Sequence, residues 1–241
     1  MPLRARDRVI VALDVSDAAQ ALGLVERLDD AVRWFKVGLE LYLSEGNSIV
    51  GAIRAKGYSV FLDLKLHDIP NTVAGAVRSA SRAGAQMLTL HAGGGPAMLV
   101  AAAEAAASVP NAPELLAVTV LTSMDQSQLQ TVGVASSPAE QVLRLAQVGW
   151  KAGIRGFVSS AEEVVAMRRS FTGATLVIPG IRPAGTAMGD QKRVATPAAA
   201  IEAGADYLVI GRPITQAADP AAAARAILAE IEETAGEKIR Y

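Results

Sequence analysis

Arg8-Val-Ile-Val-Ala-Leu-Asp14 is a short run of branched aliphatic residues, and Asp206-Tyr-Leu-Val-Ile-Gly211 repeats the pattern near the end of the chain. Runs of this kind are typical of strands that are buried on both faces of a parallel sheet. Similar runs recur between these two, and patterns rich in Ala, Leu and Glu that are typical of helices separate them. We expect strands at residues 8–14, 33–37, 59–65, 86–91, 115–121, 155–159, 175–179 and 206–211. We expect helices at residues 17–29, 39–56, 72–83, 96–107, 138–152, 161–170, 197–203 and 219–235.

Eight β-then-α units in 241 residues average about 30 residues each, which is the size of a βαβ step. The total length is also close to the ~250 residues typical of a closed (β/α)8 barrel. An open, doubly wound sheet is the alternative, but no predicted strand-turn-helix carries the G-x-G-x-x-G pattern. Gly93-Gly94-Gly95 lacks the third glycine at the required spacing and indicates a turn. The fold class we expect is therefore α/β, with residues 1–241 forming a single-domain (β/α)8 TIM barrel.

The composition excludes several classes of function. The 23 basic and 24 acidic side chains leave a net charge of −1 and only 4% of residues are aromatic, so the chain lacks the positive field and stacking platforms that nucleic-acid binding needs. The absence of cysteine rules out disulfides and thiolate metal sites, and two histidines cannot build a histidine-rich metal cage. No apolar run is long enough to cross a membrane. We expect a cytoplasmic protein with no nucleic-acid or membrane partner.

The run Phe61-Leu-Asp-Leu-Lys-Leu-His-Asp-Ile-Pro-Asn-Thr72 places charges inside the third predicted strand. Side chains alternate between the two faces of a strand, so Asp63 and Lys65 share one face and the three leucines share the other. In a barrel the leucines would pack under the helices and the two ions would point into the barrel mouth. Burial makes an unpaired ion expensive, so these two are either a structural ion pair or part of a site. Asp68 has its own structural interpretation as the N-cap of the next helix.

Two further charges lie in the neighbouring strands. Asp14 closes the first strand and Lys36 lies in the second, so that with Asp63, Lys65 and Asp68 they place alternating signs around one rim. Each has a structural alternative, because Asp14 could cap the following helix and Lys36 could extend to solvent. Active sites of (β/α)8 barrels lie at the C-terminal ends of the strands. This rim is therefore where we expect the site.

The last two predicted strands each end in glycine followed closely by arginine, at Gly180 and Arg182 and again at Gly211 and Arg212. Loops after strands seven and eight are the usual phosphate site of this barrel, since free backbone N–H groups and an arginine fork bind phosphate oxygens. The irregular segment 180–196 between them is interpreted as a lid over the phosphate, or else as a mobile surface loop. The sequence thus predicts a phosphorylated ligand.

These residues together resemble one known family. Asp63-x-Lys65-x-x-Asp68-Ile69-Pro70-x-Thr72 is similar to the signature of the orotidine 5′-phosphate decarboxylase family. The similarity extends along nearly the whole chain, through residues 11–14, 35–38, 121–123, 179–182 and 209–212. The resemblance implies a TIM barrel that forms a homodimer through its active-site end. It also implies decarboxylation of orotidine 5′-phosphate to uridine 5′-phosphate (UMP) and CO₂, the last step of de novo pyrimidine nucleotide biosynthesis, with no metal or organic cofactor.

The family pattern also implies a role for each matching residue. Lys65 would protonate C6 of the pyrimidine, with Asp63 and Lys36 beside it and Asp68 supplied by the other subunit. Loss of CO₂ leaves a carbanion that the ring delocalises poorly, so a fixed ammonium suits this position. The implied substrate contacts are Asp14, Lys36, Asp68 and Thr72 at the ribose, Ser123 and Gln191 at the base with Gln191 bridging to the phosphate, Gly211 and Arg212 at the phosphate, and Thr122 as a further substrate-binding residue. Arg182 lies at the root of the predicted lid and would either bind the substrate or only order that loop.

Two other functions stay open. Some sugar-phosphate decarboxylases and synthases resemble this barrel and share Asp-x-Lys-x-x-Asp, but they use Mg²⁺ and typically have a small residue and glycine where this chain has Ile69-Pro70. Activity in EDTA would separate them from the first hypothesis. A non-catalytic barrel that binds a phosphorylated ligand would keep Gly211 and Arg212 but would not need the charged rim. Binding of orotidine 5′-phosphate without turnover would point to that function.

Overall fold

Within the described residues, eight parallel strands close into a barrel. The structure is a computed structural model and describes residues 3–183 and 195–237. Neighbours in the barrel are neighbours in sequence, and the last strand pairs with the first to complete the ring. The strands are β1 (Val9–Leu13), β2 (Trp34–Val37), β3 (Ser59–Leu66), β4 (Met87–His91), β5 (Glu114–Val118), β6 (Gly156–Val158), β7 (Thr175–Ile178) and β8 (Tyr207–Ile210). The predicted α/β class and TIM barrel are confirmed.

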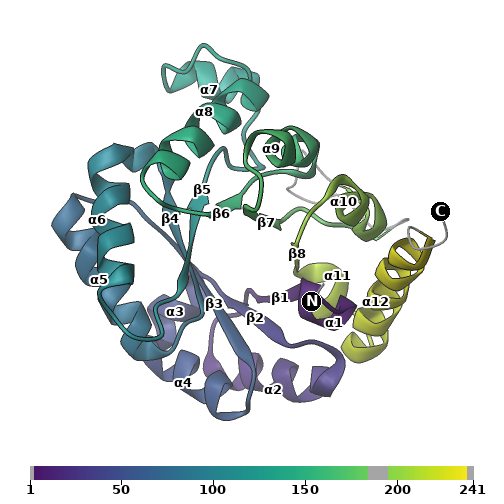
Figure 1. Cartoon of the computed structure of the whole chain (residues 1–241). Coiled ribbons are helices and arrows are strands. Elements are labelled where there is room, and N and C mark those ends of the chain that lie inside the picture. Colours follow the sequence, from purple (N-terminus) through teal and green to yellow (C-terminus); the bar gives the residue numbers. More distant parts are fainter. Residues whose placement is uncertain (1–2, 184–194, 238–241) are drawn as a thin grey trace.

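Helices follow the strands in sequence and surround the barrel (Figure 1). Those in the described part of the chain are α1 (Ala5–Arg8), α2 (Ala18–Leu28), α3 (Leu39–Glu45), α4 (Asn47–Ala55), α5 (Pro70–Ala83), α6 (Gly95–Ala107), α7 (Gln126–Thr131), α8 (Pro138–Lys151), α9 (Val164–Ser170), α10 (Pro197–Ala203), α11 (Arg212–Thr215) and α12 (Pro220–Glu237). Short 3₁₀ turns are η1 (Asp29–Ala31), η2 (Ala92–Gly94) and η3 (Ala161–Glu163).

The elements differ from the predicted ones in a few places. The predicted helix 39–56 is two helices, α3 and α4, because Gly46 between them has a φ of 61°, a left-handed conformation that ends a helix. The strand predicted at 115–121 ends at Val118. The sequence predicts neither α7 nor α11, because six and four residues are too few for an apolar period to show.

The core has two layers because alternate residues of each strand face opposite ways. The larger layer lies between the barrel and the helices. There Leu62 is buried and Leu64 and Leu66 are partly buried, as strand alternation predicts. Burying a side chain of this size contributes roughly 1.5–3 kcal/mol. The buried side chains that fill the barrel itself are Ile10, Ala12, Phe61, Met87, Leu116, Val177 and Val209.

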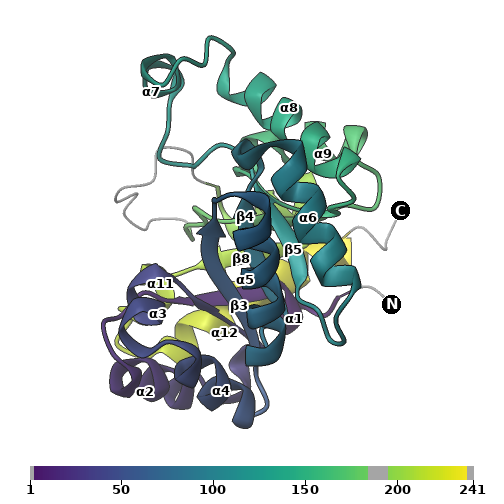
Figure 2. The same cartoon turned by 90° about the vertical axis from the view of Figure 1, so that its left-hand side faces the viewer.

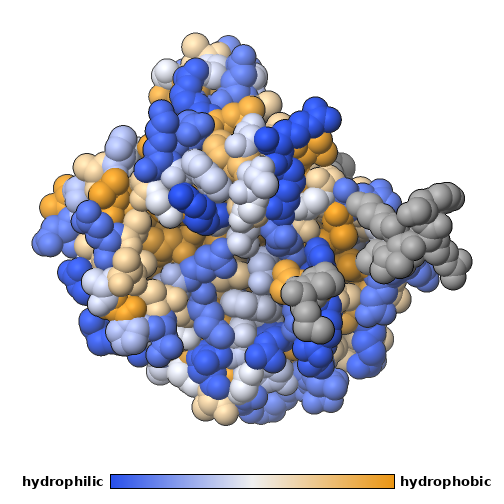
Figure 3. Space-filling view, viewed as in Figure 1, coloured by the Kyte–Doolittle hydropathy of each residue, from blue (hydrophilic) through white to orange (hydrophobic). Residues whose placement is uncertain are grey.

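The two ends of the barrel carry different elements. Figure 2 shows α3, α7 and α11 at one end and the N- and C-terminal labels at the other. Because α3 and α11 directly follow β2 and β8, the first end carries the C-terminal ends of the strands. In the face drawn in Figure 3, hydrophilic residues cover most of the periphery and hydrophobic residues form smaller patches between them. No helix in the described segments is both long and apolar enough to cross a membrane.

Candidate active site

A pocket of about 540 Å³ lies at the C-terminal ends of the strands. This is the end at which barrel enzymes place their sites. Charged residues from the ends of β1–β3 form one wall, and Val118, Val120 and Val158 from the ends of β5 and β6 form an apolar wall. The predicted site residues that line it are Asp14, Lys36, Asp63, Lys65, Thr122, Ser123, Arg182, Gly211 and Arg212.

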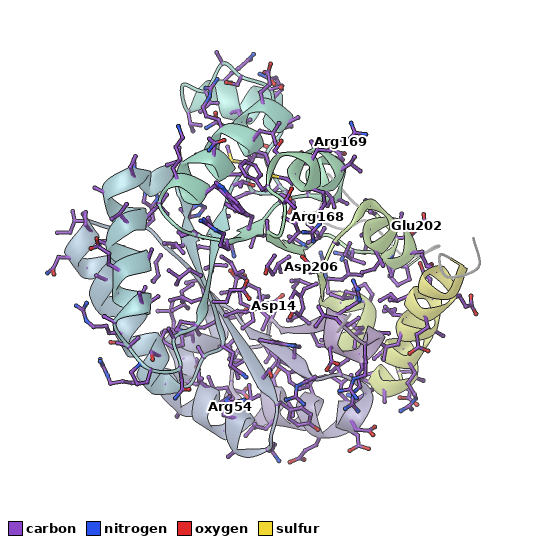
Figure 4. The ribbon with its side chains drawn as sticks, in the orientation of Figure 1. Asp14, Arg54, Arg168, Arg169, Glu202 and Asp206 are labelled. Carbon is purple, nitrogen blue, oxygen red and sulfur yellow. The ribbon has the colours of Figure 1, made fainter. Side chains whose placement is uncertain are left out.

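Four of these side chains form a row of alternating charges across the ends of β1–β3. The Lys36 Nζ lies 2.9 Å from Asp14 Oδ1 and 3.7 Å from Asp63 Oδ2. The Lys65 Nζ lies 3.0 and 2.9 Å from the two carboxylate oxygens of Asp63. Asp63 is 12% exposed and Lys65 is 32% exposed, so the lysine is the more accessible member of this pair. Figure 4 places Asp14, at one end of the row, near the middle of the ring of strands.

Asp63 keeps its charge in spite of its burial. Burial by itself raises the pKa of the carboxyl, but the charges of Lys36 and Lys65, together with hydrogen bonds from Lys65 and Thr89, outweigh it and lower the pKa below its ordinary value. The carboxylate is therefore ionised at neutral pH. It holds both ammonium groups at the inner edge of the pocket.

The structural roles considered for Asp14, Lys36 and Asp68 do not account for them. Asp17 caps α2, because its side chain accepts a hydrogen bond from the Gln20 N–H. Lys36 is buried in its ion pairs and does not extend to solvent. The N-cap of α5 is Ile69, whose side chain makes no capping bond.

The side of the pocket formed by the ends of β7 and β8 carries the glycine and arginine pairs. Gly180 has a φ of 76°, which glycine adopts at no steric cost, and it directs the chain away from the end of β7. Arg182 is half-buried and donates from Nη1 to the Ile181 carbonyl at 2.8 Å, while it also lines the pocket. Gly211 and Arg212 begin α11 directly after β8. This side therefore offers cationic side chains and backbone N–H groups. Gly211 adjoins Asp14, because β8 pairs with β1, whereas Asp63 and Lys65 on β3 lie further round the barrel.

Two of the predicted residues that the structure describes, Asp68 and Thr72, do not line this pocket. Asp68 and Thr72 are exposed, and the Asp68 carboxylate accepts a hydrogen bond of 2.6 Å from the Ile69 N–H. Gln191 and most of the predicted lid fall in 184–194, outside the described residues. The ion pairs described above connect Asp63 and Lys65 but do not include Asp68.

Two further residues belong to the site and were not predicted from the sequence. Gln216 lines it, and it lies one helical turn after Arg212, so an i, i+4 spacing was the available signal. Thr89 lies behind the pocket and donates to Asp63 Oδ1 at 2.8 Å. Its signal was a polar residue between the apolar Leu88 and Leu90 of β4.

The two histidines lie next to each other at the ends of β3 and β4. The ring centroids of His67 and His91 are 5.6 Å apart. Burial lowers the pKa of His91, and the charges of His67 and Lys65 lower it further, although Asp63 opposes them. The neutral imidazole is therefore favoured at neutral pH. Among residues 3–183 and 195–237, no group of three His, Cys, Asp or Glu side chains is arranged to hold a metal ion.

Comparison with known proteins identifies the family. The sequence model of the family described as "Orotidine 5'-phosphate decarboxylase / HUMPS family" matches residues 7–227. The chain belongs to this family.

Relatives in the family support the same assignment. A protein of Halorhodospira halophila named orotidine 5'-phosphate decarboxylase is 53% identical over 225 residues, which cover 93% of this chain and 95% of that protein. One of Moorella thermoacetica with the same name is 52% identical over 237 residues, covering 95% and 94% of the two chains. The crystal structure of orotidine 5'-phosphate decarboxylase from Lactobacillus acidophilus superposes with a TM-score of 0.82 at 38% identity, covering 93% of this chain and 99% of that one. The family match contains every predicted site residue of the chain.

Proposed function

We propose that this protein decarboxylates orotidine 5′-phosphate to uridine 5′-phosphate and CO₂, the last step of de novo pyrimidine nucleotide biosynthesis. The observation that carries the proposal is the Lys65 ammonium, held by Asp63 at the edge of a pocket whose other side carries Gly211 and Arg212. A family assignment at 53% identity to a named decarboxylase supports the same activity.

We also propose that residues 1–241 act as one domain and that the enzyme works in the cytoplasm, since a chain without cysteine suits a reducing compartment.

The charged row supplies what this reaction needs. When the bond between C6 and the carboxylate breaks, its electron pair stays on C6 and CO₂ leaves. A preorganised ammonium stabilises the developing charge, and a proton then passes from Lys65 Nζ to C6, with solvent returning a proton to the lysine. Lys36 and Asp63 position this ammonium through the ion pairs at 3.7 and 2.9 Å. Their contribution is orientation in a site that reorganises little during the reaction.

The other residues would bind the parts of the substrate that do not react. Gly211 and Arg212 would hold the phosphate, and Gln191 would bridge from the base to it. Asp14, Lys36, Asp68 and Thr72 would bind the ribose hydroxyls. Ser123 would contact the base, and Thr122 beside it would also bind the substrate. Arg182 would bind the substrate or order its own loop. Binding energy gained at the phosphate can be used to hold the base against Lys65, which raises the rate and not only the affinity.

We further propose that the active unit is a homodimer whose sites are shared. Asp68 is exposed and does not line the pocket of its own chain, and the residue beside it, Ile69, is 67% exposed. Leu39 and Leu43 on α3, which follows the neighbouring strand, are 50% and 81% exposed. Contiguous exposed apolar patches mark interaction surfaces, and we propose that these side chains form one in the dimer. On a second copy packed against this face, Asp68 and Thr72 would reach the partner's pocket.

The activity test is an ultraviolet assay of purified protein with orotidine 5′-phosphate in the presence of EDTA. We expect turnover that the chelator does not reduce. Loss of activity in EDTA would favour the Mg²⁺-dependent sugar-phosphate enzymes, and binding without turnover would favour a non-catalytic barrel.

Two variants separate the proposed roles. We expect Lys65→Ala to abolish turnover, because it removes the ammonium at the reacting carbon. We expect Arg212→Ala mainly to raise KM, by about tenfold to a hundredfold, because a charge-assisted contact to phosphate is lost. Steady-state kinetics measure both effects, and substantial turnover in Lys65→Ala would overturn the assignment of the acid.

A further inference from the structure

Thr89, on the strand next to β3, forms hydrogen bonds with both partners of the ion pair between Asp63 and Lys65. It is the third residue of β4, and it is fully buried. Its Oγ1 donates a hydrogen bond of 2.8 Å to Asp63 Oδ1 and accepts one of 2.9 Å from the Lys65 backbone N–H. One hydroxyl thus contacts both the carboxylate and the backbone of the lysine that the carboxylate holds.

The contact lies where the pairing of β3 and β4 is irregular. Leu62 is opposite Leu88 and Leu66 is opposite Leu90, so three residues of β3 face the single residue Thr89 of β4. A bulge of this kind leaves ladder groups without their usual backbone partners and re-aims side chains. The Thr89 side chain provides the acceptor for the Lys65 N–H, which satisfies a backbone donor inside the barrel.

The bulge also places Lys65 in an unusual conformation. Its φ is 49°, in the left-handed region that residues with a Cβ rarely adopt. Such a conformation persists only where the surroundings hold it, and it is found most often at functional sites. The hydrogen bond from the Lys65 N–H to Thr89 is one of the contacts that holds it.

We propose that Thr89 is a positioning residue for the decarboxylation, which fixes the left-handed backbone of Lys65 and the orientation of Asp63 so that the ammonium points at the reacting carbon. A threonine hydroxyl has one hydrogen to donate and lone pairs to accept, and both functions are used here. Because the side chain is fully buried, water cannot replace either bond without a rearrangement. The inference rests on the proposed roles of Lys65 and Asp63.

Thr89→Val tests the inference, because valine has nearly the same shape and neither donates nor accepts. We expect kcat to fall about a hundredfold, as small misplacements of a catalytic group can do, while KM changes by less than about threefold. The Thr89 hydrogen bond favours the ionised form of Asp63, so its loss raises the pKa of that carboxyl. The acid limb of the kcat/KM profile should therefore move to higher pH. Thr89→Ser keeps the hydroxyl and should restore kcat and the acid limb close to the wild-type values.

Thr119→Val is the matched control. Thr119 is also a buried threonine next to the barrel end, but its Oγ1 donates to the Val158 carbonyl at 2.8 Å. This variant should lose thermal stability like Thr89→Val while its acid limb stays in place. If both valine variants shift the profile equally, or if neither does, Thr89 has a structural role only and the inference is wrong.

Two further variants keep the test decisive. If Thr89→Val does not fold, Thr89→Cys replaces it, because a thiol is a weak donor and acceptor in nearly the same volume. Its kcat should then lie below that of Thr89→Ser, and wild-type kinetics would overturn the inference. Lys65→Ala is assayed in parallel. An inactive Lys65→Ala with unchanged Thr89 variants rejects only the role of Thr89, whereas an active Lys65→Ala rejects the proposed roles of the ion pair.

Discussion

Gly38 leaves the space that the Lys36 ammonium occupies. A Cβ at this position would lie 2.8 Å from Lys36 Nζ and 3.3 Å from Asp14 Oδ1. The backbone has φ −92° and ψ −176°, which residues with a side chain also adopt, so Gly38→Ala strains no dihedral. We expect the flexible end of the lysine to move and the row of charges to break. Steady-state kinetics should show kcat/KM lower by about tenfold or more, because the charges around Lys65 lose their geometry.

Gly23→Ala provides the control for this variant. Gly23 lies inside α2 and a Cβ there would meet nothing within 4 Å. Alanine should raise the free energy of unfolding by roughly 0.5–1 kcal/mol through the better helix propensity, with unchanged kinetics. A Gly38→Ala enzyme with wild-type kcat/KM would mean that the position of Lys36 does not matter for the reaction.

The sequence predicts which charged side chains lie together at the pocket, but it does not predict the backbone conformation that orients them. Simple alternation places Asp63 and Lys65 on one face, and the structure pairs them. It does so through a bulge and a positive φ at Lys65, which depend on Thr89 of the next strand. A contact between two residues that are 24 positions apart in sequence leaves no local pattern, so it could not be predicted from β3 alone.

Glu114, the first residue of β5, lies at the end of the barrel opposite the pocket. Burial raises the pKa of its carboxyl; a hydrogen bond with Thr175 lowers it, and the charge of Asp206 raises it further. Because the folded-state pKa is raised, the contribution of Glu114 to the free energy of unfolding is fully present at pH values below the ordinary glutamate pKa. This contribution is lost as the pH rises through the folded-state pKa, since ionisation then costs more in the folded state than in the unfolded one.

Glu114→Gln removes this ionisation and keeps a hydrogen-bonding group for Thr175. We expect the variant to melt about 2–4 °C above the wild type near pH 8, which corresponds to about 1 kcal/mol in a chain of this size. The difference should shrink near pH 4, where the wild-type carboxyl is largely protonated in both states. Thermal melting at several pH values measures it. A difference in melting temperature that does not depend on pH would show that ionisation of Glu114 does not cause it.

The hydrophobic pattern of the sequence predicted all eight strands and the longer helices, but it missed the short helices α7 and α11. Every strand formed because buried parallel strands are nearly continuous apolar runs. The break between α3 and α4 depends on one residue, Gly46, whose left-handed conformation the helical pattern on either side conceals. α7 has no apolar stripe, and its only local signal was the capping box of Asp125 and Gln128.

The molecule separates the groups that hold the barrel together from the groups that face the pocket. Arg168 on α9 donates to the Gly204 carbonyl at 2.7 Å and pairs with Asp206 just before β8 (Figure 4). Asp206 in turn accepts from the Leu176 N–H of β7 at 2.8 Å. These bonds join neighbouring βα units at the N-terminal ends of the strands. The C-terminal ends are therefore left to carry charges whose arrangement suits a ligand.

If the active sites are shared between the subunits of a dimer, mixing two inactive variants should restore activity. In a dimer of Lys65→Ala with Asp68→Ala, one site lacks both residues and the other has both, because Asp68 comes from the partner. Random mixing of equal amounts makes half of the dimers mixed, each with one intact site, so activity should return to about a quarter of the wild-type level in a symmetric dimer. Steady-state assays after unfolding and refolding the mixture together measure the recovery.

Asp63→Ala provides a control, because it separates residues that one subunit contributes to its partner's site from residues that serve the site of their own chain. Asp63 and Lys65 belong to the same pocket and are joined at 2.9 Å, so a mixed dimer of these two variants has one defect in each site. That mixture should stay inactive. Native mass spectrometry of differently tagged chains confirms that mixed dimers form in both experiments. If they form and Asp68→Ala with Lys65→Ala gives no recovery, Asp68 serves its own subunit or none, and the exposed face of α3 and Ile69 requires another explanation.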